Sequence, residues 1–212
     1  MTQRQPGRGR RRRPAAERGE SPETPPADPR QRARDICLRL LSVRPRTRAE
    51  LATALRQRGI PDEDATAVLE RYGEVGMIDD EAFAKAWVTS RHAGRGLASG
   101  ALARELRQRG VDSSAIGSAL TELDGDTEAT MARALVDRRL RSMDGLSAEV
   151  AFRRLVGMLA RKGYSSGLAV RTVRDALAER PGDDGFAGDV DMDALTDSVA
   201  GDAGTDGVGG GT

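Results

Sequence analysis

The side chains that most often catalyse reactions or bind metals are scarce in this sequence. His92 is the only histidine and Cys37 the only cysteine, which excludes paired-histidine metal sites and an internal disulfide. Cys37 lies in an apolar segment, so we expect a buried thiol rather than a nucleophile. We expect His92 at a solvated helix end. The acidic cluster 79–81 precedes a helical pattern and indicates N-capping rather than a metal or acid–base site. The sequence therefore predicts a protein that is not an enzyme and has no catalytic residues, metal or cofactor.

The glycine-rich segment 94–100, GRGLASG, is the one candidate for a phosphate-binding loop. A nucleotide-binding loop of the G-x-x-x-x-G-K-[ST] type carries a lysine and follows a strand. This segment has no lysine and no strand is predicted before it. We interpret it as a loop between helices, with phosphate contact by Arg95 as the alternative.

Positive charge is the remaining chemistry, and nearly all of it is arginine. The chain has 34 Lys and Arg against 33 Asp and Glu, and only Lys85 and Lys162 are lysines. The candidate contacts to an acidic protein surface or to DNA are Arg91, Arg95, Arg104, Arg107, Arg109, Arg138, Arg139, Arg153, Arg154, Arg161 and Lys162. We expect the main contact face to consist of Arg138, Arg139, Arg153, Arg154 and Arg161. The alternative for any one of them is a solvated surface charge.

The elements that must position these side chains repeat three times. When Gly59, Gly110 and Gly163 are aligned, leucines stand four and eight positions before each glycine, a cation stands directly before it, and an apolar residue follows. The leucines are Leu51 and Leu55, Leu102 and Leu106, and Leu155 and Leu159; the cations are Arg58, Arg109 and Lys162; the apolar residues are Ile60, Val111 and Tyr164. Leucines four apart share a helix face, and a left-handed glycine closes a helix. The aligned cations are either a row of contacts or helix C-terminal charges.

Further helical patterns flank each aligned helix. They cover 31–43, 80–92 and 127–143 before it, and 61–73, 112–123 and 165–177 after it. Thr47 and Glu50 form a predicted capping box, in which the hydroxyl and the carboxylate bind free backbone N–H groups. The sequence thus predicts an all-α protein, with three tandem three-helix repeats in an elongated, curved array. The predicted repeats are 31–76, 77–124 and 125–179.

Both ends of the chain differ from this middle part. Residues 1–30 are rich in Arg and Pro, and residues 180–212 carry eight Asp and nine Gly. Neither segment has enough large apolar residues to offset the entropy of ordering, so we predict two disordered tails. No apolar run reaches the length of a membrane span, and the start of the chain lacks the apolar centre of a signal peptide. We expect a cytoplasmic monomer.

Three-helix units also suggest a helix-turn-helix, whose later helix enters the major groove of DNA. The charges of the later helices argue against that function here. Segment 61–73 begins with three acids, and segment 112–123 has no basic residue. Phosphates would repel such helices.

The stretch GMIDDEAFAKAWVTSR (76–91) resembles a signature of the RecX family, regulators of the RecA recombinase. The shared pattern is a glycine, an apolar pair, an acidic pair and Phe-Ala, which here includes Gly76, Asp79, Asp80, Phe83 and Ala84. The stretches ALARELRQRGV (101–111) and LARKGYSSGLAVRTV (159–173) resemble later signatures of the same family. The resemblance spans about 33–179. From the residues alone we interpret the first pattern as a turn, a helix cap and a core pair.

The resemblance implies a non-enzymatic protein that binds the RecA filament on single-stranded DNA. It implies inhibition of the RecA ATPase, of filament growth and of strand exchange, and so modulation of homologous recombination and DNA repair, including the SOS response. The partners implied are the RecA filament and single-stranded DNA within or near it. A helical protein that binds DNA without RecA is the alternative, and a generic helical scaffold is a third possibility.

Overall fold

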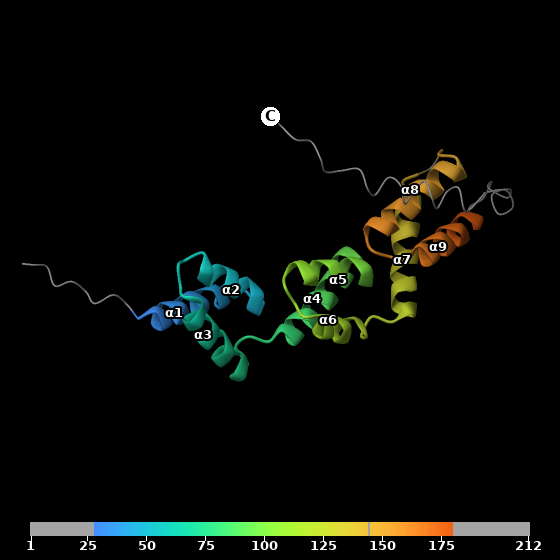
Figure 1. Cartoon of the computed structure of the whole chain (residues 1–212). Helices are drawn as coiled ribbons and strands as arrows, with labels where there is room; N and C mark the ends of the chain where they lie inside the picture. The colour runs from blue at the N-terminus through green and yellow to red at the C-terminus, as the bar shows by residue number, and fades with distance from the viewer. Residues whose placement is uncertain (1–27, 144, 180–212) are drawn as a thin grey trace, which may run out of the picture.

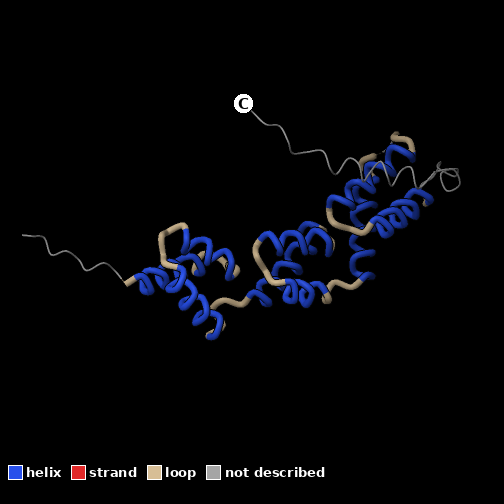
Figure 2. Tube along the Cα trace, in the orientation of Figure 1, coloured by secondary structure: helices blue, strands red, loops and turns tan. Residues whose placement is uncertain are grey.

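The computed structural model describes residues 28–143 and 145–179, and these residues form nine helices and no strand (Figures 1 and 2). The all-α prediction is confirmed. The helices are α1 (Pro29–Leu41), α2 (Arg48–Arg56), α3 (Asp62–Glu74), α4 (Asp80–Arg95), α5 (Ser99–Gln108), α6 (Ser113–Leu120), α7 (Gly125–Leu140), α8 (Ala148–Arg161) and α9 (Ser166–Ala178). The tails predicted to be disordered are 1–30 and 180–212; of these, residues 1–27 and 180–212 lie outside the described residues, and Pro29 and Arg30 are helical. Helix α1 begins two residues earlier than predicted, because the Asp28 side chain caps it by accepting from the Arg30 N–H at 3.1 Å.

Each set of three helices encloses its own hydrophobic core. All six aligned leucines have an exposed fraction of 0%. The apolar residue after each aligned glycine is buried as well, and its N–H donates to the carbonyl of the leucine five positions before it. These bonds are Ile60 to Leu55 at 3.2 Å, Val111 to Leu106 at 3.1 Å and Tyr164 to Leu159 at 3.2 Å. The same helix end is thus built three times, as the alignment predicts.

The three repeats follow one another in a row rather than packing around a common centre. Figure 1 shows an elongated, bent array, with α2 and α5 on its inner, concave side and α7 at the start of the third repeat. The extensive helix–helix packing lies within each repeat: α1 with α3, α4 with α6, and α7 and α8 with α9. Neighbouring repeats therefore meet through turns and helix ends.

Two buried side chains test the predictions made for single residues. Cys37 is buried as predicted, and burial raises the pKa of its thiol to about 11, which suits a packing residue. The prediction for His92 is wrong, since this side chain is only 8% exposed. Helix α4 continues to Arg95 and turns at Gly96, so the chain folds back over the ring. His92 Nδ1 then lies 2.9 Å from the Leu97 carbonyl oxygen, and we assign the ring proton to Nδ1.

Candidate functional site

The turn at Gly163 joins the third repeat to the second. The Ala98 N–H donates to the Lys162 carbonyl at 2.9 Å, and Lys162 Nζ donates to the Arg95 carbonyl at 2.6 Å. Gly163 has a φ of +88°, and a Cβ there would lie 2.2 Å from the backbone nitrogen of Ala101. Only glycine fits this contact, because any larger residue would meet backbone.

Buried groups strengthen this second joint. The Tyr164 hydroxyl donates to the Gly96 carbonyl at 3.2 Å, and Ala98 is part of the hydrophobic core of the third repeat. A Cβ on Gly96 would lie 2.8 Å from Leu135 Cδ1, so the two repeats are in close contact here as well. The joint combines apolar burial with hydrogen bonds to the backbone.

The turn at Gly110 joins the second repeat to the first in the same way. The Thr47 hydroxyl donates to the Arg109 carbonyl at 2.7 Å, and a Cβ on Gly110 would lie 2.3 Å from Ala49 Cβ. Thr47 Oγ1 also accepts from the Glu50 N–H at 3.1 Å, as the capping box requires. The predicted return bond from Glu50 is wrong: its carboxylate pairs with the Arg109 guanidinium and with Arg44 at 3.2 Å. The Glu50 carboxylate of the first repeat therefore binds Arg109 of the second repeat at the joint.

A carboxylate from each following repeat also caps the N-terminus of a helix in the preceding repeat. The Arg48 N–H, at the start of α2, donates to Asp80 Oδ1 at 2.9 Å. The Ser99 N–H, at the start of α5, donates to Glu128 Oε1 at 2.6 Å. The first N–H groups of a helix have no partner inside it, so each carboxylate satisfies one of them. Asp79 caps its own helix by accepting from the Ala82 N–H at 2.8 Å, as predicted for the acidic cluster.

Replacing Asp80 by asparagine should change how stability depends on pH. Burial raises the pKa of the Asp80 carboxyl, against the lowering effect of the Arg48 N–H. A group whose pKa is higher in the folded than in the unfolded state stabilises the fold at pH below its unfolded pKa. This stabilisation is lost as the pH rises through its folded pKa. Asp80→Asn removes the charge but keeps the hydrogen-bond acceptor. The free energy of unfolding of the variant, relative to that of the unchanged chain, should therefore be higher at pH 7 than near pH 4, by less than about 1 kcal/mol. Urea unfolding at both pH values measures this difference.

The control for this experiment has the opposite sign. Hydrogen bonds from Ser114 lower the pKa of Asp112, which caps α6. Asp112 therefore stabilises the fold at pH above its unfolded pKa, and this stabilisation is lost as the pH falls through its folded pKa. Asp112→Asn should be more harmful at pH 7 than near pH 4. A pH dependence of the same sign for both variants would contradict the assignment for Asp80.

The aligned cations before the glycines do not share one role. Arg58 Nη1 donates to the Ala54 carbonyl at 2.8 Å in its own helix, as a C-terminal charge would. Arg109 and Lys162 instead reach the preceding repeat. Within the described residues no repeat comes before the turn at Gly59, and a Cβ on Gly59 would meet nothing within 4 Å. The third repeat differs at the position ten residues before the aligned glycine. Ala49 and Gly100 occupy this position in the first two repeats, whereas the third repeat has Arg153, which is exposed. A bulky side chain at this position suits the last unit of the array.

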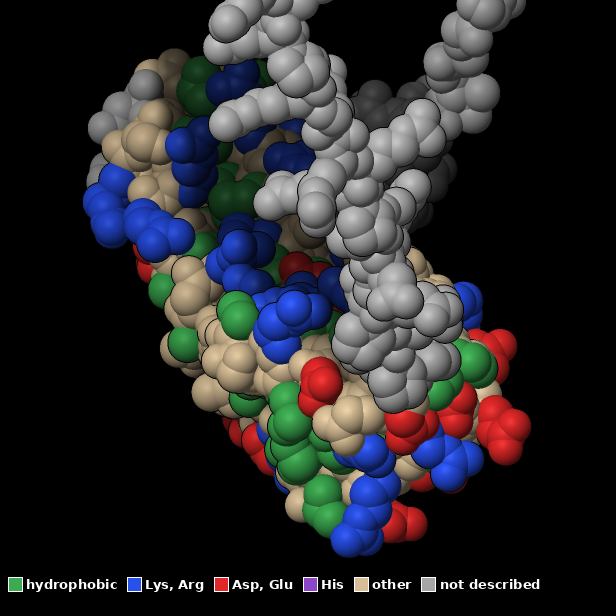
Figure 3. All heavy atoms as spheres, turned by 90° about the vertical axis from the view of Figure 1, so that its left-hand side faces the viewer, with side chains coloured by type: hydrophobic (Ala, Val, Ile, Leu, Met, Phe, Trp, Pro, Cys, Tyr) green, Lys and Arg blue, Asp and Glu red, His purple; other side chains and the backbone are tan. Residues whose placement is uncertain are grey.

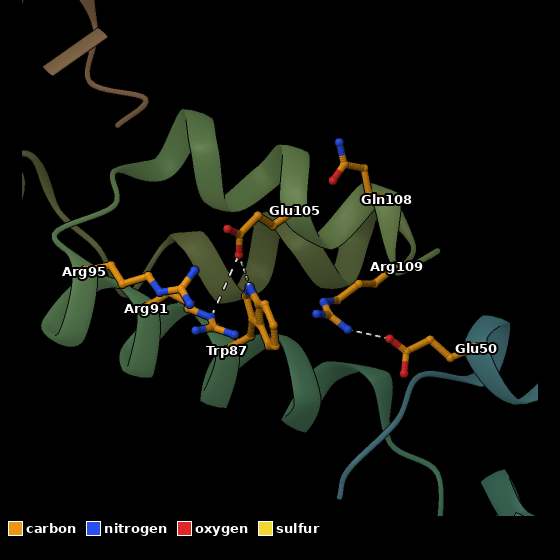
Figure 4. A pocket seen from close by; sticks show the side chains of 7 residues that line it. All are labelled: Glu50, Trp87, Arg91, Arg95, Glu105, Gln108 and Arg109. Carbon is orange, nitrogen blue, oxygen red and sulfur yellow. Dashed lines mark hydrogen bonds and ion pairs between the residues drawn. The ribbon is translucent and has the colours of Figure 1, made fainter. Parts of the chain in front are cut away.

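A pocket of about 420 Å³ lies at the first joint, between α2, α4 and α5 (Figure 4). Its lining residues are Glu50, Trp87, Arg91, Arg95, Glu105, Gln108 and Arg109. The Trp87 indole N–H donates to Glu105 Oε2 at 2.8 Å. The Arg91 and Arg109 guanidinium carbons lie 4.1 and 3.9 Å from the Trp87 ring centre, within cation–π range. Trp87 also stacks on Phe83, which lies four residues before it on the same helix, with ring centres 5.7 Å apart.

The structure brings some of the predicted contact residues together and separates others. Arg91, Arg95 and Arg109 meet in the pocket. Lys162 lies at the next joint, where burial and then the charge of Arg138 lower the pKa of its ammonium. Figure 3 shows Lys and Arg side chains gathered in a hollowed band along one face of the array. The other predicted residues are exposed, on α5 (Arg104 and Arg107), α7 (Arg139) and α8 (Arg153, Arg154 and Arg161). Arg153 has a neighbour on its own helix, Glu149, at 3.6 Å.

Sequence reasoning missed four of the seven pocket residues: Glu50, Trp87, Glu105 and Gln108. Glu50 was assigned to a capping box, and Trp87, Glu105 and Gln108 were given no role at a site. The available signal was the presence of the only tryptophan four residues before Arg91, because arginine stacks readily on aromatic faces. Pairing with Arg109 depends on how α4 and α5 pack, which residue spacing does not give.

The described residues contain no cluster of acidic, histidine and cysteine side chains that could hold a metal ion. In the same part of the chain, no helix is both long and apolar enough to span a membrane. Three small cores, glycine-dependent joints and a band of arginines define a helical repeat protein.

The comparisons give the particular family. Models of the first, second and third three-helix domains of RecX match residues 33–71, 79–120 and 126–173, in that order. The chain therefore belongs to the RecX family. The regulatory protein RecX of Streptomyces coelicolor is 56% identical over 174 residues, which cover 82% of this chain and 90% of that protein. The regulatory protein RecX of Thermobifida fusca is 60% identical over 152 residues, covering 72% of this chain and 82% of that one. These relatives are regulatory proteins, in agreement with the prediction of a non-enzymatic protein.

Two crystal structures share the architecture. RecX from Lactobacillus salivarius aligns with a TM-score of 0.66 at 18% identity, over 71% of this chain and 97% of that one. A second crystal structure, of a regulatory protein RecX, aligns with a TM-score of 0.63 at 26% identity, over 70% of this chain and 73% of that chain. At 18% identity the first likeness supports the fold alone.

Proposed function

We propose that this protein binds the RecA filament on single-stranded DNA and inhibits its ATPase, its growth and strand exchange, and so modulates homologous recombination and DNA repair. The observation that carries the proposal is the band of cations on a curved array in a chain of the RecX family. An elongated body can follow the groove of a helical filament over several subunits. Its arginines can meet both acidic protein surface and the enclosed DNA, because guanidinium groups bind carboxylates and phosphates alike. Such a partner places the protein in the cytoplasm, where it would act as a monomer.

The shape of the array supports groove binding over contact at a single point. The joints fix each repeat against the next through hydrogen bonds that involve the backbone and through glycine contacts, so the spacing between binding surfaces is set before binding. Preorganised surfaces lose less entropy on association than flexible ones. A rigid, curved row of small domains is suited to a regularly repeating partner.

The purified protein should lower the DNA-dependent ATPase rate of RecA at ratios at or below one molecule per RecA subunit. The reason is that a bound array spans neighbouring subunits and restrains the changes between them that accompany ATP hydrolysis. A titration of the protein into RecA, ATP and circular single-stranded DNA measures the effect. An unchanged ATPase rate at every ratio would exclude the proposal.

The second candidate is a DNA-binding protein that acts without RecA. The same band of cations is compatible with it, since phosphates attract arginines irrespective of other proteins. The two functions differ in their preferred partner. If naked single-stranded DNA in physiological salt is bound as tightly as the RecA filament, the second function is favoured. Absence of binding to either would favour the generic scaffold.

A further inference from the structure

The pocket at the first joint presents oriented positive charge at the junction of two repeats. Arg91 and Arg109 lie over the Trp87 ring, and Glu105 holds the indole by its N–H. A guanidinium stacked on an aromatic face keeps its N–H edges free to bind oxygen atoms in the ring's surroundings. The tryptophan therefore acts as a support that fixes two arginines at one site.

Arg95 is the pocket cation that remains available. Its side chain is exposed and makes no hydrogen bond or ion pair with the residues the structure describes. Its backbone is nevertheless fixed, because its carbonyl accepts from Lys162 Nζ at 2.6 Å. Gln108 adds an exposed amide on the facing helix α5 (Figure 4). The two acids of the lining are engaged, Glu50 with Arg44 and Arg109, and Glu105 with the Trp87 indole and, at 4.0 Å, with Arg91.

This arrangement selects an anion. Three arginines against two carboxylates leave the lining with a net positive charge. The Trp87 ring already stacks with two guanidiniums and with Phe83, so it does not offer a free platform for a nucleic-acid base. Trp87 is also the only apolar residue of the lining, so the pocket offers little apolar surface for an anchor side chain to bury. The ligand would be recognised by its charge and by its oxygen atoms.

The surroundings of the pocket favour a polymer of anions over a single one. The cations continue from Arg95 to Lys162 at the next joint, and from Lys162 to Arg138, whose charge acts on it. We propose that the pocket binds a phosphate of single-stranded nucleic acid, whose backbone continues over Lys162 and Arg138. A flexible single strand can place one phosphate in a recess on a concave surface, which a stiff duplex cannot do as readily. The inference rests on the proposed function, because it assigns the DNA part of that binding to one site.

The test uses the full chain, the variant Arg91→Gln/Arg95→Gln and a labelled oligothymidylate of about twenty nucleotides, with anisotropy measured from about 50 to about 200 mM salt. The variant should bind roughly tenfold more weakly in low salt. Its slope of log affinity against log salt should fall by about 0.7, since the loss of one phosphate contact on a single strand removes about 0.7. The control Arg32→Gln/Arg39→Gln removes two exposed arginines from α1 and should leave both values unchanged.

Every outcome decides the question. Equal affinity and slope for the pocket variant and the unchanged chain, or no binding of the oligonucleotide even in low salt, would overturn the inference. If the variant keeps oligonucleotide binding but loses ATPase inhibition, the pocket binds acidic protein surface instead, and the inference is again wrong. If the variant is destabilised, Arg95→Gln alone should still lower the affinity and the slope, the slope by no more than about 0.7. If the pocket variant loses oligonucleotide binding while the unchanged protein has no effect on RecA, the proposed function is wrong and the phosphate site is still supported.

Discussion

Replacing Gly163 by alanine should open the joint between the second and third repeats, whereas replacing Gly59 should leave the array intact. Both glycines have a positive φ, +88° and +70°, so each substitution puts a Cβ into the left-handed region at a cost of about 1–2 kcal/mol. Only at Gly163 does the new Cβ also meet backbone, 2.2 Å from the nitrogen of Ala101. We therefore expect Gly163→Ala to lower the free energy of unfolding by more than about 3 kcal/mol and Gly59→Ala by about half of that or less.

Urea unfolding gives the two stabilities, and small-angle X-ray scattering gives the shape of the folded variants. Gly163→Ala should change the radius of gyration, because the hydrogen bond from Ala98 to Lys162 cannot form when the turn is displaced. Gly59→Ala is the matched control for backbone strain without contact. Equal losses of stability and equal scattering for the two variants would show that the close approach at Gly163 has no role in holding the repeats together.

The first joint allows a rescue experiment, because the obstacle there is a side chain. A Cβ on Gly110 would lie 2.3 Å from Ala49 Cβ, so the Ala49→Gly change removes that obstacle. Ala49→Gly alone should cost about 1 kcal/mol in helix propensity. If the contact matters, the double variant loses less than the sum of the two single variants. This non-additivity separates packing at the joint from the effects of each residue alone.

The sequence was sufficient to predict the helices and their threefold repetition. Leucines at fixed distances from a glycine specify a helix face and a helix end locally, and this information survives without any tertiary contact. The helices accordingly lie within a few residues of the predicted segments. The joints could not be predicted in this way, because Thr47 meets Arg109 across 62 residues. One signal was available: the positions ten residues before the aligned glycines hold Ala49, Gly100 and Arg153. Small residues in the first two repeats and a bulky one in the last indicate where another repeat docks.

The candidate site was predictable in its residue types and much less in its arrangement. Charge and exposure follow from composition, so the arginines were identified as a set. Their partners depend on packing: Arg109 joins a glutamate of another repeat and the ring of Trp87. His92 shows the same limit, because its burial results from a turn at Gly96 that brings the Leu97 carbonyl over the ring.

Reversing the charges of Arg154 and Arg161 should weaken binding to the RecA filament by roughly a hundredfold, because like charges brought together across an interface cost several kcal/mol. Both residues lie on α8, seven positions apart and thus on one face, and both are exposed. Arg154 occupies the aligned position of Glu50 and Ala101, which in the first two repeats lies at the joint with the next one. In the third repeat no further repeat covers this surface within the described residues, so it is free for a partner.

The matched control is Arg32→Glu/Arg39→Glu, which reverses the charges of two exposed arginines on α1 that are also seven residues apart. Each double variant changes the net charge of the chain by the same amount, so a difference between them reports position and not charge. Filament binding by co-sedimentation and ATPase inhibition should both decline for the α8 variant, with a flatter salt dependence, and decline little for the α1 variant. Unfolding curves should be alike, since the four arginine side chains have no hydrogen-bond or ion-pair partner among the described residues. Full inhibition by the α8 variant would mean that these arginines are only solvated surface charges, and that the filament is bound through the pocket and the joints further along the array.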